Sequence, residues 1–110
     1  IARQPFMVGG TGRFDTRLMQ QLGERVCCKV GAEGVYCAAL PTLGLGVALK
    51  MDDGNNARAA EVAMAALLLR LLPLEGADLA LVEALAAPLL RNWRGIEVGR
   101  LSAAEALRAP

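Results

Sequence analysis

The chain has 110 residues, of which 55% are hydrophobic and only 4% aromatic, and its twelve basic and eleven acidic residues leave a net charge of +1. This balance argues against a nucleic-acid-binding protein, because binding phosphates needs a basic patch. The length fits one small domain, so residues 1–110 are expected to form a single unit. The aliphatic excess predicts that more chain or a partner subunit covers part of it, and we expect a homo-oligomer.

The predicted elements begin with an extended lead-in over residues 1–10. Phe14, Leu18 and Leu22 then recur every four residues, which predicts a helix that Gly23 ends. Three short strands follow, and the short connections between them predict an antiparallel meander. These strands are expected at residues 25–30, 35–40 and 45–51. In the third strand, apolar and small residues alternate, which predicts close packing on the small-residue face.

The second half of the chain is predicted to be mostly helical. The Ala- and Leu-rich residues 57–72 are apolar on nearly all sides, which is typical of a buried helix and here predicts one pressed on the sheet. A further helix is expected at 77–86, a short strand at 95–101 and one more helical turn within 102–110. The whole order indicates an α+β fold, an antiparallel sheet with packed helices.

No apolar run in the sequence is long enough to cross a bilayer, so no membrane partner is expected. The chain starts at Ile1 without a signal-like stretch, and we expect it to be a fragment of a larger protein.

The three cysteines, Cys27, Cys28 and Cys37, form an odd set. Neighbouring residues on a strand point to opposite faces, so Cys27 and Cys28 are not expected to pair with each other. Core packing and a cytoplasmic location are favoured over a disulfide framework. Because the chain contains no histidine, neither a metal site nor a cysteine nucleophile is expected.

Lys29 is the strongest candidate for a residue with a chemical role. It leaves the first strand on the face opposite Cys28, and Gly31, which lacks a Cβ, lets a substrate approach the backbone closely. A lysine amine in water is a poor base, but burial beside another cation makes it able to activate a serine hydroxyl. The alternative, which the residues alone favour, is a solvated strand lysine.

Other candidate residues leave two interpretations open. Glu33 is either an exposed turn carboxylate or holds the turn or a substrate amine. Arg13 and Asp15, at the start of the first helix, face either a cleft or solvent. Lys50 is a second cleft lysine or, as is commoner, extends from the strand end into solvent. The glycine-rich residues 9–12 lack the spacing of a phosphate-binding loop.

The stretches GTGRFDTRLM, KVGAEGVYCAALP and GLGVALKMDDG, followed by an Ala-rich helix, resemble the asparaginase II family, the type with a serine β-lactamase-like fold. They are also similar to glutaminases of that fold. The resemblance covers most of residues 7–70, and beyond them only the NWRGIEVG element matches. It implies that this chain is the C-terminal portion of a longer protein.

The resemblance also implies site residues. The nucleophilic serine of an S-x-x-K pair, and the family's metal-associated residues, would lie upstream. Lys29 matches the lysine of the family's K-[ST]-G strand motif, but Val30 departs from it and supplies no hydroxyl for a substrate carboxylate. Asp15 stands where members often carry a cysteine. The implied substrate-binding residues are Gly31, Ala32, Glu33, Arg13 and Asp15.

The activity that the resemblance implies is hydrolysis of the side-chain amide of L-asparagine to aspartate and ammonia. A serine outside this chain would attack, lysines would accept protons in place of histidine, and no cofactor is expected. The partners would be a small-molecule amide and the rest of the same chain. Two alternatives stay open: a glutaminase or other serine β-lactamase-like hydrolase, and a non-catalytic assembly module.

Overall fold

The computed structural model describes residues 13–52, 54–55 and 59–104. The predicted lead-in over residues 1–10 lies outside the described residues, as does most of the predicted last helical turn. The chain divides into two compact units, Ile1–Ala60 and Glu61–Pro110. Each is described by itself, and the single unit expected from the sequence stays a prediction.

The first unit opens with helix α2 (Phe14–Leu22), which the four-residue spacing predicted. The apolar stripe of this helix is buried, with Leu18 and Leu22 almost completely removed from solvent. Gly23 ends the helix with a φ of +63°, and its backbone N–H caps the Met19 carbonyl. This positive φ is a conformation that glycine adopts at little cost.

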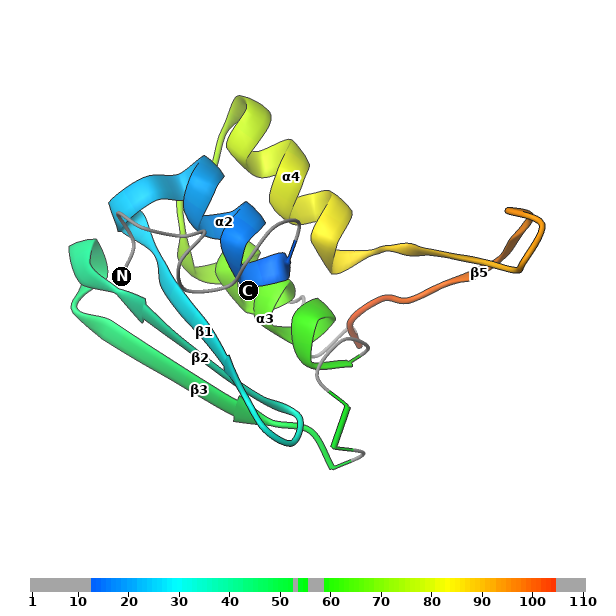
Figure 1. Cartoon of the computed structure of the whole chain (residues 1–110). Helices are drawn as coiled ribbons and strands as arrows, with labels where there is room; N and C mark the ends of the chain where they lie inside the picture. Colours follow the sequence, from blue (N-terminus) through cyan, green and yellow to red (C-terminus); the bar gives the residue numbers. More distant parts are fainter. Residues whose placement is uncertain (1–12, 53, 56–58, 105–110) are drawn as a thin grey trace. The chain divides into compact units, whose positions relative to one another are not determined.

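A three-stranded antiparallel sheet in the order β1-β2-β3 follows (Figure 1). The strands are β1 (Cys27–Gly31), β2 (Val35–Leu40) and β3 (Leu45–Lys50). The first begins two residues later than predicted, because the chain makes a 3-10 turn, η1 (Gly23–Arg25), after α2. A second 3-10 turn, η2 (Pro41–Leu43), connects β2 to β3. The predicted meander, and with it the α+β class, is confirmed.

The sheet has an inner face that is buried against α2. Tyr36 lies on this face, and its ring meets that of Phe14 edge-on, with the ring centroids 5.3 Å apart. Cys28, Ala38 and Leu40 are buried on the same face. An edge-to-face aromatic pair stabilises the contact between helix and sheet by more than the burial of its apolar area contributes.

The outer face of the sheet carries small side chains. Cys37 pairs with Lys29 on one side and with Ala48 on the other, and residues opposite each other share a face. Cys37 is exposed and Cys27 only half-buried, so the prediction that all three cysteines pack in the core is wrong for Cys37. Strand alternation explains this, since Cys37 follows the buried Tyr36 directly.

The turn between β1 and β2 is packed against the turn that follows β3. Gly34 has a φ of +71°, and a Cβ at this position would lie 3.0 Å from the Met51 carbonyl oxygen and 3.1 Å from backbone atoms of Gly54. The Met51 N–H donates a hydrogen bond of 2.8 Å to the Gly34 carbonyl. The two turns therefore touch through backbone atoms, which leaves no room for a side chain at Gly34.

The second unit contains two helices and a β-hairpin. Most of helix α3 (Ala59–Leu71) belongs to it, and this helix is buried over much of its surface, as its composition predicted. Helix α4 (Gly76–Ala86) follows, and strands β4 (Leu89–Arg91) and β5 (Glu97–Arg100) form an antiparallel pair. The short strand predicted at 95–101 is therefore confirmed, while its partner β4 was not predicted.

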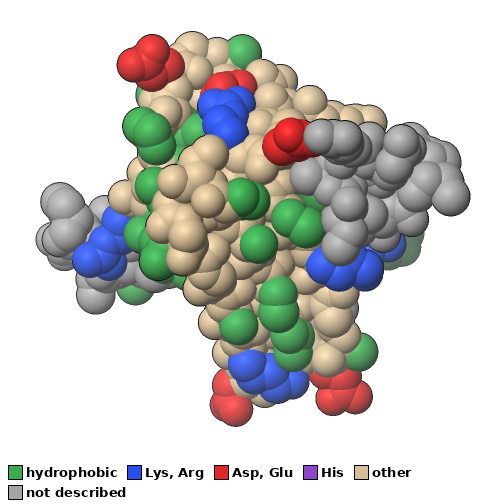
Figure 2. Space-filling model, turned by 90° about the vertical axis from the view of Figure 1, so that its left-hand side faces the viewer, with side chains coloured by type: hydrophobic (Ala, Val, Ile, Leu, Met, Phe, Trp, Pro, Cys, Tyr) green, Lys and Arg blue, Asp and Glu red, His purple; other side chains and the backbone are tan. Residues whose placement is uncertain are grey.

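Residues 101–104 carry no regular structure. None of the helices in the described ranges is both long and apolar enough to span a bilayer. On the face drawn in Figure 2, hydrophobic side chains lie in several small groups, with basic and acidic side chains interspersed.

The turn-on-turn contact predicts that Gly34→Ala destabilises the protein more than Gly44→Ala. Both residues have a positive φ, near +70°, which costs an alanine about 1 kcal/mol. Nothing lies within 4 Å of a Cβ at Gly44, whereas overlap at Gly34 adds about 1–3 kcal/mol. Urea unfolding of the full-length protein measures both losses. Equal losses would show that the two turns do not touch as described.

Candidate functional site

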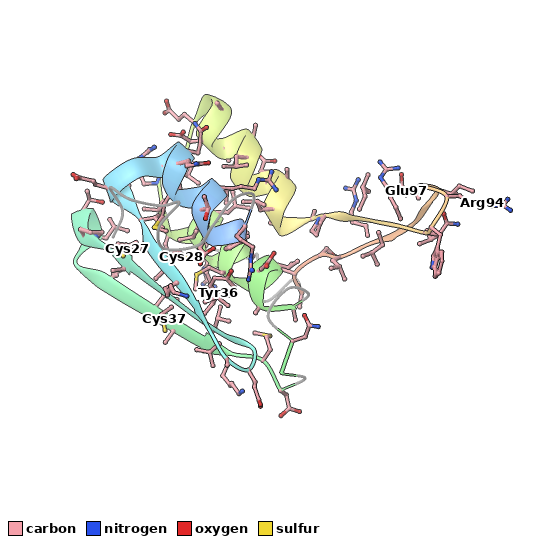
Figure 3. All side chains as sticks on the ribbon, in the orientation of Figure 1. Cys27, Cys28, Tyr36, Cys37, Arg94 and Glu97 are labelled. Atoms are coloured by element: carbon pink, nitrogen blue, oxygen red, sulfur yellow. The ribbon has the colours of Figure 1, made fainter. Side chains whose placement is uncertain are left out.

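Lys29 lies near the end of β1 and projects from the outer face of the sheet. Its side chain is exposed, and its Nζ donates a hydrogen bond of 3.0 Å to the backbone carbonyl of Val30. Figure 3 shows Cys28 and Tyr36 on one side of the sheet and Cys37, the cross-strand neighbour of Lys29, on the other. The ammonium is thus presented on the side of the sheet away from α2, with small neighbours around it.

The turn after Lys29 brings three more of the predicted site residues together. Gly31 ends β1, and Ala32 and Glu33 are exposed in the turn. A Cβ at Gly31 would meet Val35 at 3.4 Å, an ordinary contact, so the space beside this glycine is partly occupied by the next strand. Lys29, Ala32 and Glu33 are exposed and Gly31 is half-buried, and these four residues are here called the rim.

Lys50 stabilises the turn that carries this rim, a role that the sequence did not predict. Its Nζ donates a hydrogen bond to the backbone carbonyl of Glu33 across the turn. The carboxylate of Glu33 stays exposed. Of the two roles considered for Lys50, a cleft lysine or a solvated one, neither includes this contact. Lys50 reaches the turn because it lies opposite Val35 in the β2–β3 pairing. Neither strand by itself predicts this register.

Arg13 and Asp15 lie away from the rim, on α2. Arg13 precedes the helix in an extended conformation and is exposed, and its carbonyl accepts the hydrogen bond from Arg17 N. Asp15 is completely buried, with its Oδ1 accepting a 3.2 Å hydrogen bond from Thr16 N. Its Oδ2 has no hydrogen-bond partner among the described residues.

The structure thus groups four of the predicted site residues and separates two. Because α2 packs on the inner face and Lys29 projects from the outer face, Asp15 and Lys29 lie on opposite sides of the sheet. The catalytic and substrate-binding roles of all six stay predictions. Within the described ranges, no three Cys, Asp or Glu side chains come together in a way that would hold a metal ion.

Comparison with known proteins identifies the family of this α+β chain. The family model described as L-asparaginase II matches residues 1–103. The chain therefore belongs to the L-asparaginase II family, as its motifs predicted. The match continues past residue 70 and includes α4 and the β4–β5 hairpin. No curated protein matches the chain.

The contact of Lys50 with the turn predicts different costs for removing the two lysines of the outer face. Lys50→Met keeps the aliphatic stem but loses the bond to Glu33, and should lower the free energy of unfolding by about 1 kcal/mol. Among the described residues, the Lys29 ammonium bonds to the carbonyl of the next residue alone, so Lys29→Met should change the free energy of unfolding by less than about 0.5 kcal/mol. Urea unfolding of the full-length variants measures both. An equal loss of stability in Lys29→Met would contradict the conclusion that the bond from Lys50 to Glu33 stabilises the turn.

Proposed function

We propose that the protein hydrolyses the side-chain amide of L-asparagine to aspartate and ammonia, and that the rim of Lys29, Gly31, Ala32 and Glu33 forms one wall of its active site. The family match over residues 1–103 is the observation that carries this proposal. The exposed position of Lys29 beside a turn that Gly34 and Lys50 hold in place supports it.

The nucleophile of the proposed reaction is a serine outside this chain. Ser102 is the only serine in the sequence, and the residue three positions later is Glu105, so the chain contains no S-x-x-K pair. The serine hydroxyl would attack the amide carbon, its proton would pass to an amine, and ammonia would leave with formation of an ester. Water would then release aspartate and regenerate the serine. Without histidine in the chain, Lys29 is the group proposed to accept or position that proton.

A lysine amine serves as a base in proteins when it is withdrawn from water, so the proposed role requires Lys29 to be covered. The small neighbours of Lys29 on the outer face, Cys37 and Ala48, leave space for another segment to lie close to the sheet. We infer that the part of the protein that carries the serine packs there.

Val30 limits how the substrate is held. It stands where the family motif has a hydroxyl residue, and it pairs with Tyr36 on the inner face of the sheet. The α-carboxylate of asparagine therefore cannot be bound by a side chain at this position. In the proposed site, that contact comes from another cation or from backbone N–H groups.

Lys29→Ala in the full-length enzyme should lower turnover of asparagine by at least about a hundredfold, the usual contribution of a proton-transfer group. Ammonia release measured at saturating asparagine, with glutamine in a parallel assay, tests this. The matched control is Cys37→Ser, which changes the cross-strand neighbour of Lys29 and should leave turnover within about twofold, because no thiol chemistry is proposed. Unchanged turnover in Lys29→Ala would rule out the assigned role.

Residues 1–110 produced alone should release no ammonia from asparagine, because the nucleophile is proposed to lie outside them. Addition of the remaining part of the protein as a separate chain should restore activity if the two parts reassociate. Ammonia release by residues 1–110 alone, above that of the Lys29→Ala version of the same piece, would place the nucleophile within this chain.

A further inference from the structure

The second unit contains a cavity between one face of α3 and one face of α4. Helix α3 contributes Ala66, Leu69 and Arg70, and α4 contributes Glu83 and Ala86. Residues three and four apart lie on the same side of a helix, so each helix turns a single face to this space. The cavity has a volume of about 280 Å³. This volume lies at the lower limit for small-molecule sites and suits a metabolite of the size of an amino acid.

The floor of this cavity is built from small, packed side chains. Ala87, Ser102 and Ala103 complete its wall, and half of the lining residues are alanines. Their methyl groups leave open a space that larger side chains would fill in a close-packed interior. Ala66 and Ala103 belong to a buried apolar cluster, and Leu101 packs against this cluster. The hollow is therefore a formed part of the unit.

The rim of the cavity offers one charge of each sign. Arg70 and Glu83 are the two charged residues that line it, and both are exposed. Among the residues that the structure describes, these two side chains do not form an ion pair with each other. The hydroxyl of Ser102, which also lines the cavity, adds a hydrogen-bond donor and acceptor. A cation and an anion thus stand above an apolar floor, each able to bind a group of the opposite charge.

This combination favours a zwitterion over other small ligands. A divalent cation takes about six or more oxygen ligands, whereas one carboxylate lines the cavity. A nucleotide is too large for this volume, and its several phosphate charges would meet a single arginine. An α-amino acid uses both charges at once, because a guanidinium binds a carboxylate through two parallel hydrogen bonds and a carboxylate accepts from an ammonium.

We propose that the α3–α4 cavity binds an α-amino acid with an aliphatic side chain, of the size of leucine. Arg70 donates to the α-carboxylate, Glu83 accepts from the α-ammonium, and the side chain lies on the alanine floor, where its burial contributes to affinity. Asparagine binds less well, because the floor has no partner for its side-chain amide. This binding site shares no residue with the rim around Lys29 and does not depend on the proposed amidohydrolase activity.

Titration calorimetry of the full-length protein with L-leucine tests the proposal. A dissociation constant of roughly 0.1–1 mM is expected for so small a ligand in an open site. Leucinamide lacks the carboxylate and 4-methylpentanoate lacks the ammonium. Each should bind at least about tenfold more weakly, which is the usual effect of losing a charged hydrogen bond. Asparagine, measured in the Lys29→Ala protein, should also bind at least about tenfold more weakly than leucine.

Two variants assign each charge of the ligand to its residue. Arg70→Met should weaken leucine binding at least about tenfold and remove the preference for leucine over leucinamide, but keep the preference over 4-methylpentanoate. Glu83→Gln should do the reverse. Both residues are exposed, so melting temperatures should stay unchanged. The matched controls, Arg94→Met and Glu75→Gln, change exposed residues of the same unit outside the cavity and should leave leucine binding unaltered.

Three results would overturn the proposal. The first is the absence of leucine binding at concentrations up to about ten times the expected dissociation constant. The second is leucine binding that Arg70→Met and Glu83→Gln leave intact, or that Lys29→Ala abolishes, because leucine then occupies a different site. The third is equal binding of leucine and 4-methylpentanoate, which would show that the ammonium group is not recognised.

Discussion

The two-residue alternation of the β1-β2-β3 sheet determines where the chemically useful side chains of the first unit lie. It places Tyr36 on the inner face, where its ring contacts Phe14 and holds α2 against the sheet. The same alternation turns the neighbouring Cys37, and with it Lys29, to the outer face. A shift of register by one residue would exchange the two faces, burying the lysine and exposing the aromatic contact.

The turns of the β1–β2 and β4–β5 hairpins are stabilised in different ways. The β1–β2 turn is stabilised from outside, by the backbone of the next turn pressing on Gly34 and by Lys50 bonding to Glu33. The β4–β5 turn is stabilised from within, through the side chain of Asn92. The first arrangement fixes the shape of the turn beside Lys29. The second leaves the outer surface of its turn free, and so suits contact with another molecule.

Both surfaces are incomplete in the described chain. Lys29, the lysine of the proposed active site, is exposed, and the proposed role requires it to be covered. The β4–β5 hairpin exposes Trp93 to solvent. The high aliphatic content of the sequence, 55% hydrophobic residues with few aromatic ones, agrees with surfaces that are covered in the assembled protein.

The sequence by itself determined the local elements and the family. The spacing of Phe14 and Leu18 predicted α2, and the family motifs identified the lysine strand and its glycine turn, because these signals lie within a few consecutive residues. Only the tertiary structure decided which residues meet. The three residues of β4 alternate too little to predict a strand and become one only through hydrogen bonds to β5. The exposure of Cys37, the burial of Asp15 and the bond from Lys50 to Glu33 likewise depend on strand register and helix packing. These contacts join residues far apart in the chain, so no pattern within a single segment specifies them.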